Sequence, residues 1–192
     1  MTSAARQTSD RRGFTILEMV MVLSIFMLLI GGGVAALYFN RDEARLNDGM
    51  GEIEVMAKRA RMLASLQQKP YALEFTRQGV ALMPYGEATL EPREREALIG
   101  EEMIALKQSE GTISPNKRES WALDAEMQLL VRRWSVGEWE LLKRSDRHVW
   151  RFDPQGICEP FGVRIEMENG SWIAALFHPL TAGITEVESE IQ

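Results

Sequence analysis

The stretch that decides the fold runs from residue 13 to residue 39 and reads GFTILEMVMVLSIFMLLIGGGVAALYF. Between Phe14 and Phe39 the only charged side chain is that of Glu18. As a helix this segment would be about 39 Å long at 1.5 Å per residue, whereas the hydrocarbon core of a bilayer is roughly 30 Å thick. The pattern therefore predicts a transmembrane helix over residues 14–39.

Glu18 is the unusual residue of this span. A carboxylate inside an apolar helix costs about 2.5–3.5 kcal/mol on insertion scales, so we expect it to have a specific role. Residues 1–12 are polar and slightly basic, which favours a cytoplasmic start of the segment. The apolar run is longer than the core of a signal peptide, and no small-residue cleavage site follows it. A plain signal anchor is the alternative.

Residues 11–18, Arg-Arg-Gly-Phe-Thr-Ile-Leu-Glu, resemble the processing site of type IV pilins and type II secretion pseudopilins. In that family a prepilin peptidase cuts after the glycine and methylates the new terminal amine. The resemblance implies cleavage between Gly13 and Phe14, removal of residues 1–13 as a cytoplasmic leader, and N-methylation at Phe14. It also implies that Glu18 is the family's fifth-position glutamate. A basic leader, Gly-Phe, the glutamate and the apolar run occur in order, so the match is specific.

This processing site gives Glu18 a physical role in assembly. In a filament of such helices, the amine that cleavage creates lies among apolar surfaces, and a neighbour's carboxylate relieves the desolvation of both charges. The same attraction fixes the axial register of the helices.

Further along, Gly31, Gly32 and Gly33 each cost about 1 kcal/mol in a helix interior. They predict a weak point in the helix or, alternatively, a close helix–helix contact.

The pattern changes after Asn40. Residues 40–68 are amphipathic, with one apolar stripe at helical spacing and charged residues elsewhere. We expect this half of the helix to lay its stripe against a domain and to stop before Pro70. The stripe consists of Leu46, Met50, Ile53, Ala57, Ala60 and Ala64, flanked by Leu63 and Leu66.

Residues 69–192 are predicted to form a β-rich globular domain with an insertion at about 86–120. The insertion is expected to include a short helix at 94–107 and to present a solvated charged face. We expect the five tryptophans to enter the core, with one or two at a subunit interface. For residues 137–144 the sequence predicts either a strand or a helical turn. Predicted strands are 71–77 and 80–85, joined by a Gln78-Gly79 turn, then 127–134, 148–152, 163–167 and 171–177, the last two joined at Asn169-Gly170, and 184–187.

The C-terminal half carries a second resemblance. Phe152-Asp153-Pro154-Gln155-Gly156 and the later Thr181-Ala182-Gly183 resemble the turns of H-type minor pseudopilins and their type IV relatives. The chain departs from that pattern at Ala182, which separates the threonine from the glycine. Together the resemblances imply a type IV pilin-like α+β fold. In such a fold a long N-terminal helix, transmembrane in its first half, packs on an antiparallel β-sheet domain.

No catalytic or metal-binding constellation stands out. Cys158, His148 and His178 lack an orienting group or oxyanion motif, so we expect structural roles and no enzyme activity. The alternating acidic tail at residues 186–190 lacks the glycine that folds a calcium loop, and it is predicted to be a solvated acidic edge. Neither a metal nor a cofactor is expected. The net charge of −6 argues against nucleic acid as a partner.

These observations favour a minor pseudopilin of a type II secretion system, at or near the tip of a periplasmic pseudopilus that drives export across the outer membrane. The expected partners are the prepilin peptidase, other major and minor pseudopilins, the inner-membrane assembly platform and, before assembly, the lipid bilayer. The chain would sit in the inner membrane with its C-terminal domain in the periplasm. The alternatives are a minor pilin of a type IV pilus and a signal-anchored periplasmic protein.

Overall fold

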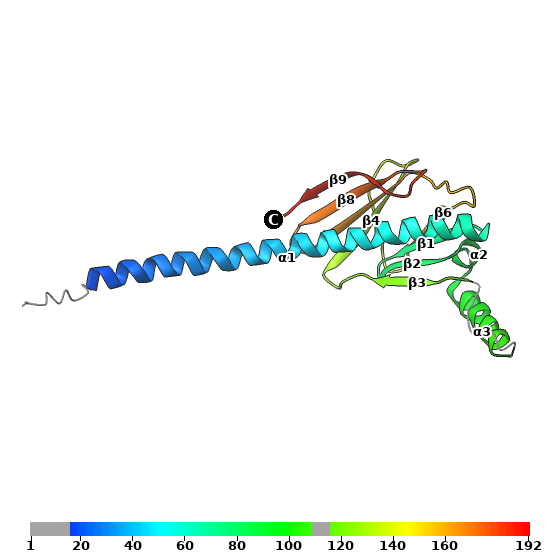
Figure 1. The fold of residues 1–192 in the computed structure, drawn as a ribbon, viewed down its shortest axis with the longest axis horizontal. Coiled ribbons are helices and arrows are strands. Elements are labelled where there is room, and N and C mark those ends of the chain that lie inside the picture. The colour runs from blue at the N-terminus through cyan, green and yellow to red at the C-terminus, as the bar shows by residue number, and fades with distance from the viewer. Residues whose placement is uncertain (1–15, 109–115) are drawn as a thin grey trace, which may run out of the picture. The chain divides into compact units, whose positions relative to one another are not determined.

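A computed structural model of the chain describes residues 16–108 and 116–192, without the side chains of residues 31–40 and 106–108. The chain divides into two compact units between Arg41 and Asp42, and each unit is treated by itself. The elements of Figure 1 are α1 (Ile16–Gln67), β1 (Tyr71–Thr76), β2 (Gly79–Pro84), α2 (Tyr85–Ala88), α3 (Pro92–Gln108), β3 (Glu119–Ala122), β4 (Met127–Arg133), β5 (Glu140–Leu141), β6 (Arg147–Phe152), β7 (Phe161–Met167), β8 (Trp172–Phe177) and β9 (Ile184–Glu190).

Helix α1 ends before the proline that the sequence marks as its stop. Gln67 is its last residue, and Gln68 takes a positive φ of 54° two residues before Pro70. In the unit that begins at Asp42, the apolar stripe of α1 is buried as predicted. Its members, Leu46, Met50, Ile53, Ala57, Ala60 and Ala64, are each at most 2% exposed.

The strands form two antiparallel sheets, where the sequence predicted a β domain without dividing it. The first sheet has the order β3-β2-β1-β6 and the second has the order β5-β4-β7-β8-β9. The later turns of α1 lie across both sheets (Figure 1), and the stripe belongs to the same core cluster as Leu73 of β1 and Ile165 of β7. A mixed fold of one long helix on antiparallel sheets results, which is consistent with a pilin-like fold.

Gly49 shows how closely the helix approaches both sheets. A Cβ at this position would lie 3.1 Å from Cδ1 of Ile165 in β7 and 3.3 Å from Cη2 of Trp121 in β3. Gly51, one half-turn away, has nothing within 4 Å of the same hypothetical atom. The sequence shows both glycines only as helix-weakening residues, whereas the fold requires a small residue at Gly49.

Most predicted strands are present, with several local corrections. The first hairpin turns at Arg77 and Gln78, one residue earlier than predicted, because Thr76 pairs with Gly79. The hairpin of β7 and β8 turns at residues 168–170 as predicted, with Gly170 at a φ of 90°. Only Glu140–Leu141 of the ambiguous 137–144 segment is a strand, and β9 extends to Glu190 as an exposed edge.

The charged insertion differs from its predicted solvated face. Its last residues belong to β3, which pairs with β2, and α3 covers the predicted helix. Arg118 donates from Nε and Nη2 to both carboxylate oxygens of the buried Glu87 in α2, at 2.7 and 2.9 Å, and also pairs with Glu102 of α3. Buried ion pairs are stable only where each charge finds its partner. The insertion is therefore joined to the domain by paired charges.

A second such pair ties α3 to the first sheet. Arg95 donates from Nη1 and Nη2 to the buried carboxylate of Glu74 in β1, at 2.6 and 2.8 Å. The guanidinium of Arg147, at the start of β6, lies 3.7 Å from the same carboxylate and also donates to the carbonyl of Leu90. The predicted solvated face is thus wrong for this part of the insertion, because a bidentate arginine satisfies an acid that the sheet buries.

The tryptophans do not all enter the core. Trp150 is buried, stacks on Phe161 and donates from Nε1 to the carbonyl of Glu159 at 2.9 Å. Trp134 is 81% exposed and lies outside the core, as the prediction allows for one or two of the five. Trp139 and Trp172 are half-buried beneath arginine side chains on the outer face of the second sheet.

Candidate functional site

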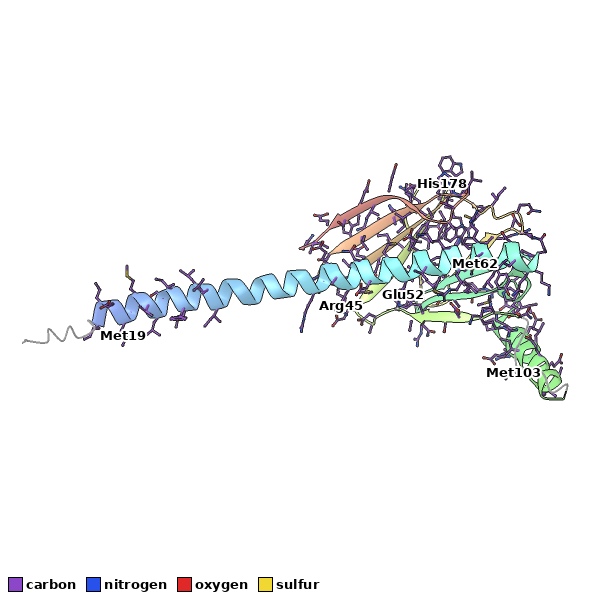
Figure 2. The ribbon with its side chains drawn as sticks, viewed as in Figure 1. Met19, Arg45, Glu52, Met62, Met103 and His178 are labelled. Carbon is purple, nitrogen blue, oxygen red and sulfur yellow. The ribbon has the colours of Figure 1, made fainter. Side chains whose placement is uncertain are left out.

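The first described turns of α1 carry apolar side chains on every face of the helix. From Ile16 to Ile30 each residue is exposed, including Leu17 at 80% and Met19 at 54% (Figure 2). The hydroxyl of Ser24 donates to the carbonyl of Val20 at 2.8 Å, so this polar group is satisfied within the helix. A helix that is apolar all round is normally surrounded by protein or lipid. This segment therefore needs an environment that the monomer does not provide.

Glu18 is the charged residue of this segment and lies in the first described turn of α1. Its side chain is exposed. Its role in the assembly of subunits stays a prediction.

The other predicted site residues have different outcomes. Gly13 and Phe14 lie outside the described residues. Gly31, Gly32 and Gly33 are helical within α1, and their role as a weak point stays a prediction. Within residues 16–108 and 116–192, no helix meets the combined length and apolarity that a membrane span requires. The span predicted over residues 14–39 extends past the side chains that are described, and it too stays a prediction.

The turn after β6 that carries the second resemblance lies against α1. Asp153 and Gly156 close it, because the amide of Gly156 donates to the carbonyl of Asp153 at 2.8 Å. Arg61 of α1 then donates from Nε to the carbonyl of Gly156 at 2.9 Å. Gly156 has a φ of 77°, and a Cβ there would lie 3.3 Å from Oγ of Ser65. Glycine is needed for both the backbone conformation and the close approach.

The loop between β8 and β9 is also fixed to α1. The amide of Ile184 donates to Oε1 of Glu54 at 3.1 Å, and Nζ of Lys58 lies 2.8 Å from the same oxygen. Ala182, where the chain departs from the family pattern, is fully buried with a φ of 53°. This left-handed backbone conformation is one that glycine adopts more readily than alanine. Two C-terminal turns thus hold the second half of α1 by hydrogen bonds.

The cysteine and histidines do not come together as a catalytic group. Cys158 is buried, its thiol donates to the carbonyl of Pro179 at 3.4 Å, and burial raises its pKa to about 12. His148 is buried against Phe161, and burial with the nearby Arg133 lowers its pKa to about 4. His178 accepts a hydrogen bond at Nδ1 from the amide of Leu180. Each is engaged in local structure.

Comparison with known families supports the N-terminal resemblance. Residues 8–34 match the prokaryotic N-terminal methylation motif. No curated protein and no solved structure matches the chain. The motif indicates a type IV pilin-like or pseudopilin protein, and it implies processing by a prepilin peptidase and assembly with other pilin-like subunits. It also suggests a membrane-anchored, export-related protein.

Proposed function

We propose that the chain is a minor pseudopilin of a type II secretion system, assembled at or near the tip of a periplasmic pseudopilus. The observation that carries the proposal is the methylation motif at residues 8–34, joined to a helix that is apolar on all sides. Support for the secretion class comes from the Phe152–Gly156 turn and the 181–183 loop, which resemble those of H-type minor pseudopilins. Both turns are hydrogen-bonded to α1.

The proposed mechanism is structural, with no catalytic step. Prepilin peptidase cuts between Gly13 and Phe14 at the inner membrane and methylates the new amine. The carboxylate of Glu18 then pairs with the terminal amine of a neighbouring subunit, which sets the axial register. The apolar surface of the segment, first in contact with lipid, is transferred to the same surface of sister subunits. The C-terminal domain lies in the periplasm throughout.

Replacing the glutamate tests the assembly step. Glu18→Gln removes the charge and retains the shape, so we expect normal cleavage and about tenfold less co-purification with other pseudopilins, since one charge of the pair is lost. Glu52→Gln, an exposed carboxylate of the same helix (Figure 2), is the matched control and should assemble normally. Assembly of Glu18→Gln at the control level would contradict the register role.

Deleting the gene in its host tests the class of filament. Loss of exoprotein secretion with pili retained supports the proposal. Loss of pili with secretion retained would overturn it in favour of a minor pilin.

Blocking cleavage by the prepilin peptidase gives a second test, because Gly13→Ala adds a Cβ at the cleavage site. We expect the unprocessed precursor to accumulate, and normal processing of this variant would contradict the assigned cleavage site.

A further inference from the structure

A cavity of about 400 Å³ opens at one end of the second sheet. It lies where β4 ends, β7 begins and β8 ends, since Arg133 pairs with Phe161 and Phe161 pairs with Phe177. Phe161, Phe177 and Trp134 are among the residues that line it, together with Pro160 and Pro179. This volume is in the range of cavities that enclose drug-sized ligands. The cavity is therefore large enough for more than a single side chain.

Arg133 brings a positive charge to this apolar cavity. Its Nε and Nη2 lie 3.0 and 2.8 Å from Nδ1 of His148, and arginine has only donors, so the imidazole nitrogen accepts. A buried imidazole with a lowered pKa is neutral at pH 7 and offers no counter-charge. In the described part of the chain, no carboxylate forms an ion pair with Arg133. The guanidinium is thus held in place by His148 and forms no ion pair with the described carboxylates, although Asp153 and Glu159 line a second cavity beside it.

His178 lines the same cavity and adds a second donor. Because its Nδ1 accepts the amide hydrogen of Leu180 at 3.1 Å, the neutral ring carries its proton on Nε2. None of the described residues that line the cavity is acidic. The chain as a whole carries a net charge of −6, so this cavity is opposite in sign to the molecule around it. The positive charge and the apolar lining of the cavity together favour a ligand that has an anionic group and an apolar part.

We propose that the cavity binds the C-terminal end of a partner polypeptide whose last residue is apolar. A terminal residue carries a carboxylate and a side chain on one Cα, so it can meet Arg133 and fill the aromatic wall at once. The carboxylate accepts hydrogen bonds from the guanidinium and from Nε2 of His178, and the penultimate residue fills the remaining volume. The proposal concerns the β domain and does not rest on the proposed secretion role.

Calorimetry on the full chain in lipid nanodiscs tests the site, with empty nanodiscs as the blank. The probe is acetyl-Ala-Ala-Phe with a free carboxylate, compared with the same peptide as its terminal amide. We expect saturable binding of the acid at one site per chain and about tenfold weaker binding of the amide, which lacks the charge. 3-Phenylpropionate, which has only the ring and the acid, should bind about tenfold more weakly than the peptide acid.

Two exposed residues supply the variants, so folding is expected to be retained and is checked by near-ultraviolet circular dichroism. Arg133→Gln should reduce binding of the peptide acid to the level of the amide, and Trp134→Ala should weaken both peptides. Arg77→Gln, an equal charge loss at the exposed hairpin turn, is the matched control and should bind as the wild type does. Equal binding of acid and amide, or no saturable binding, would overturn the proposal. Equal binding of 3-phenylpropionate and the peptide acid would overturn the polypeptide ligand.

Discussion

The two halves of α1 dispose of their apolar side chains in opposite ways. Residues 16–30 are apolar around the whole helix, and all of them are exposed in the monomer. Residues 46–64 place their apolar groups on one face, and that face is buried in the domain core. Among the described residues, the first apolar surface stays uncovered, whereas the second is covered by the sheets of the same chain. In the function proposed above, the first half of α1 serves assembly, and the second half belongs to the folded domain.

Placing one charge in each half gives the largest expected effect. Ile53→Asp puts a carboxylate at a position that is 0% exposed, so we expect a loss of roughly 3–5 kcal/mol in the free energy of unfolding. That is a large fraction of the stability of a typical domain. Ile25→Asp places the same group on an exposed position of the first half and should leave domain stability unchanged.

Urea unfolding followed by tryptophan fluorescence measures both variants, because Trp150 is buried in the core. Leu66→Asp, an exposed position near the end of α1, is the control for adding a charge to the second half. If Ile25→Asp destabilised the domain as much as Ile53→Asp, the division of labour between the two halves would be wrong.

Two glycines in the second half of α1, Gly49 and Gly51, should respond differently to replacement by alanine, with smaller effects on the stability of the domain. Gly51→Ala should stabilise the domain by about 1 kcal/mol, because alanine favours the helix and nothing lies near the new Cβ. Gly49→Ala gains the same helix propensity but forces Ile165 and Trp121 to move, so no stabilisation is expected. The midpoint of urea unfolding distinguishes the two. Equal stabilisation by the two substitutions would show that α1 leaves room for a Cβ at Gly49, contrary to the close approach described above.

The smallest effect concerns the hydrogen bond that joins α1 to the 181–184 loop. The hydrogen bond from Lys58 lowers the pKa of Glu54 below its ordinary value of 4.5, partial burial opposes this, and the Ile184 amide adds to it. Because the folded pKa is the lower one, the stabilisation is present above pH 4.5 and is lost as the pH falls through the folded pKa. The contribution of a surface pair is under about 1 kcal/mol.

Glu54→Gln cannot titrate, so it should lose less stability than the wild type between pH 7 and pH 3. Urea unfolding at each pH measures the difference, with Glu52→Gln as a control for loss of an exposed carboxylate on the same helix. A wild-type loss identical to that of Glu54→Gln would show that the loop contact contributes nothing to stability.

The parts of the fold that the sequence predicts correctly are those with a local signal, such as helical spacing of apolar residues or a turn motif. The buried stripe, the end of α1 before Pro70 and the hairpin at Asn169-Gly170 follow from patterns within a few residues. The division into two sheets does not, because β1 pairs with β6, some 75 residues later in the chain, and no local pattern encodes that choice. The exposure of Trp134 has no local signal either, because the sequence places this residue inside the predicted strand 127–134, whereas β4 ends at Arg133.

The buried charges were missed for a related reason. Glu74 interrupts an apolar strand, and its partner Arg95 lies 21 residues later on α3. From the sequence, an insertion rich in both signs of charge is typical of a solvated surface. An acid within a strand whose neighbours are all apolar was the available signal. The cavity beside Arg133 depends on three strand ends meeting and had no sequence signal of its own.

The position of the mature N-terminus decides whether the chain is processed as a pilin-like protein. Mass spectrometry of the protein purified from membranes of its host measures where the mature chain begins. We expect a chain that starts at Phe14 and carries one methyl group on its terminal amine. A chain that retains Met1, or one that is cut at any other position, would contradict it.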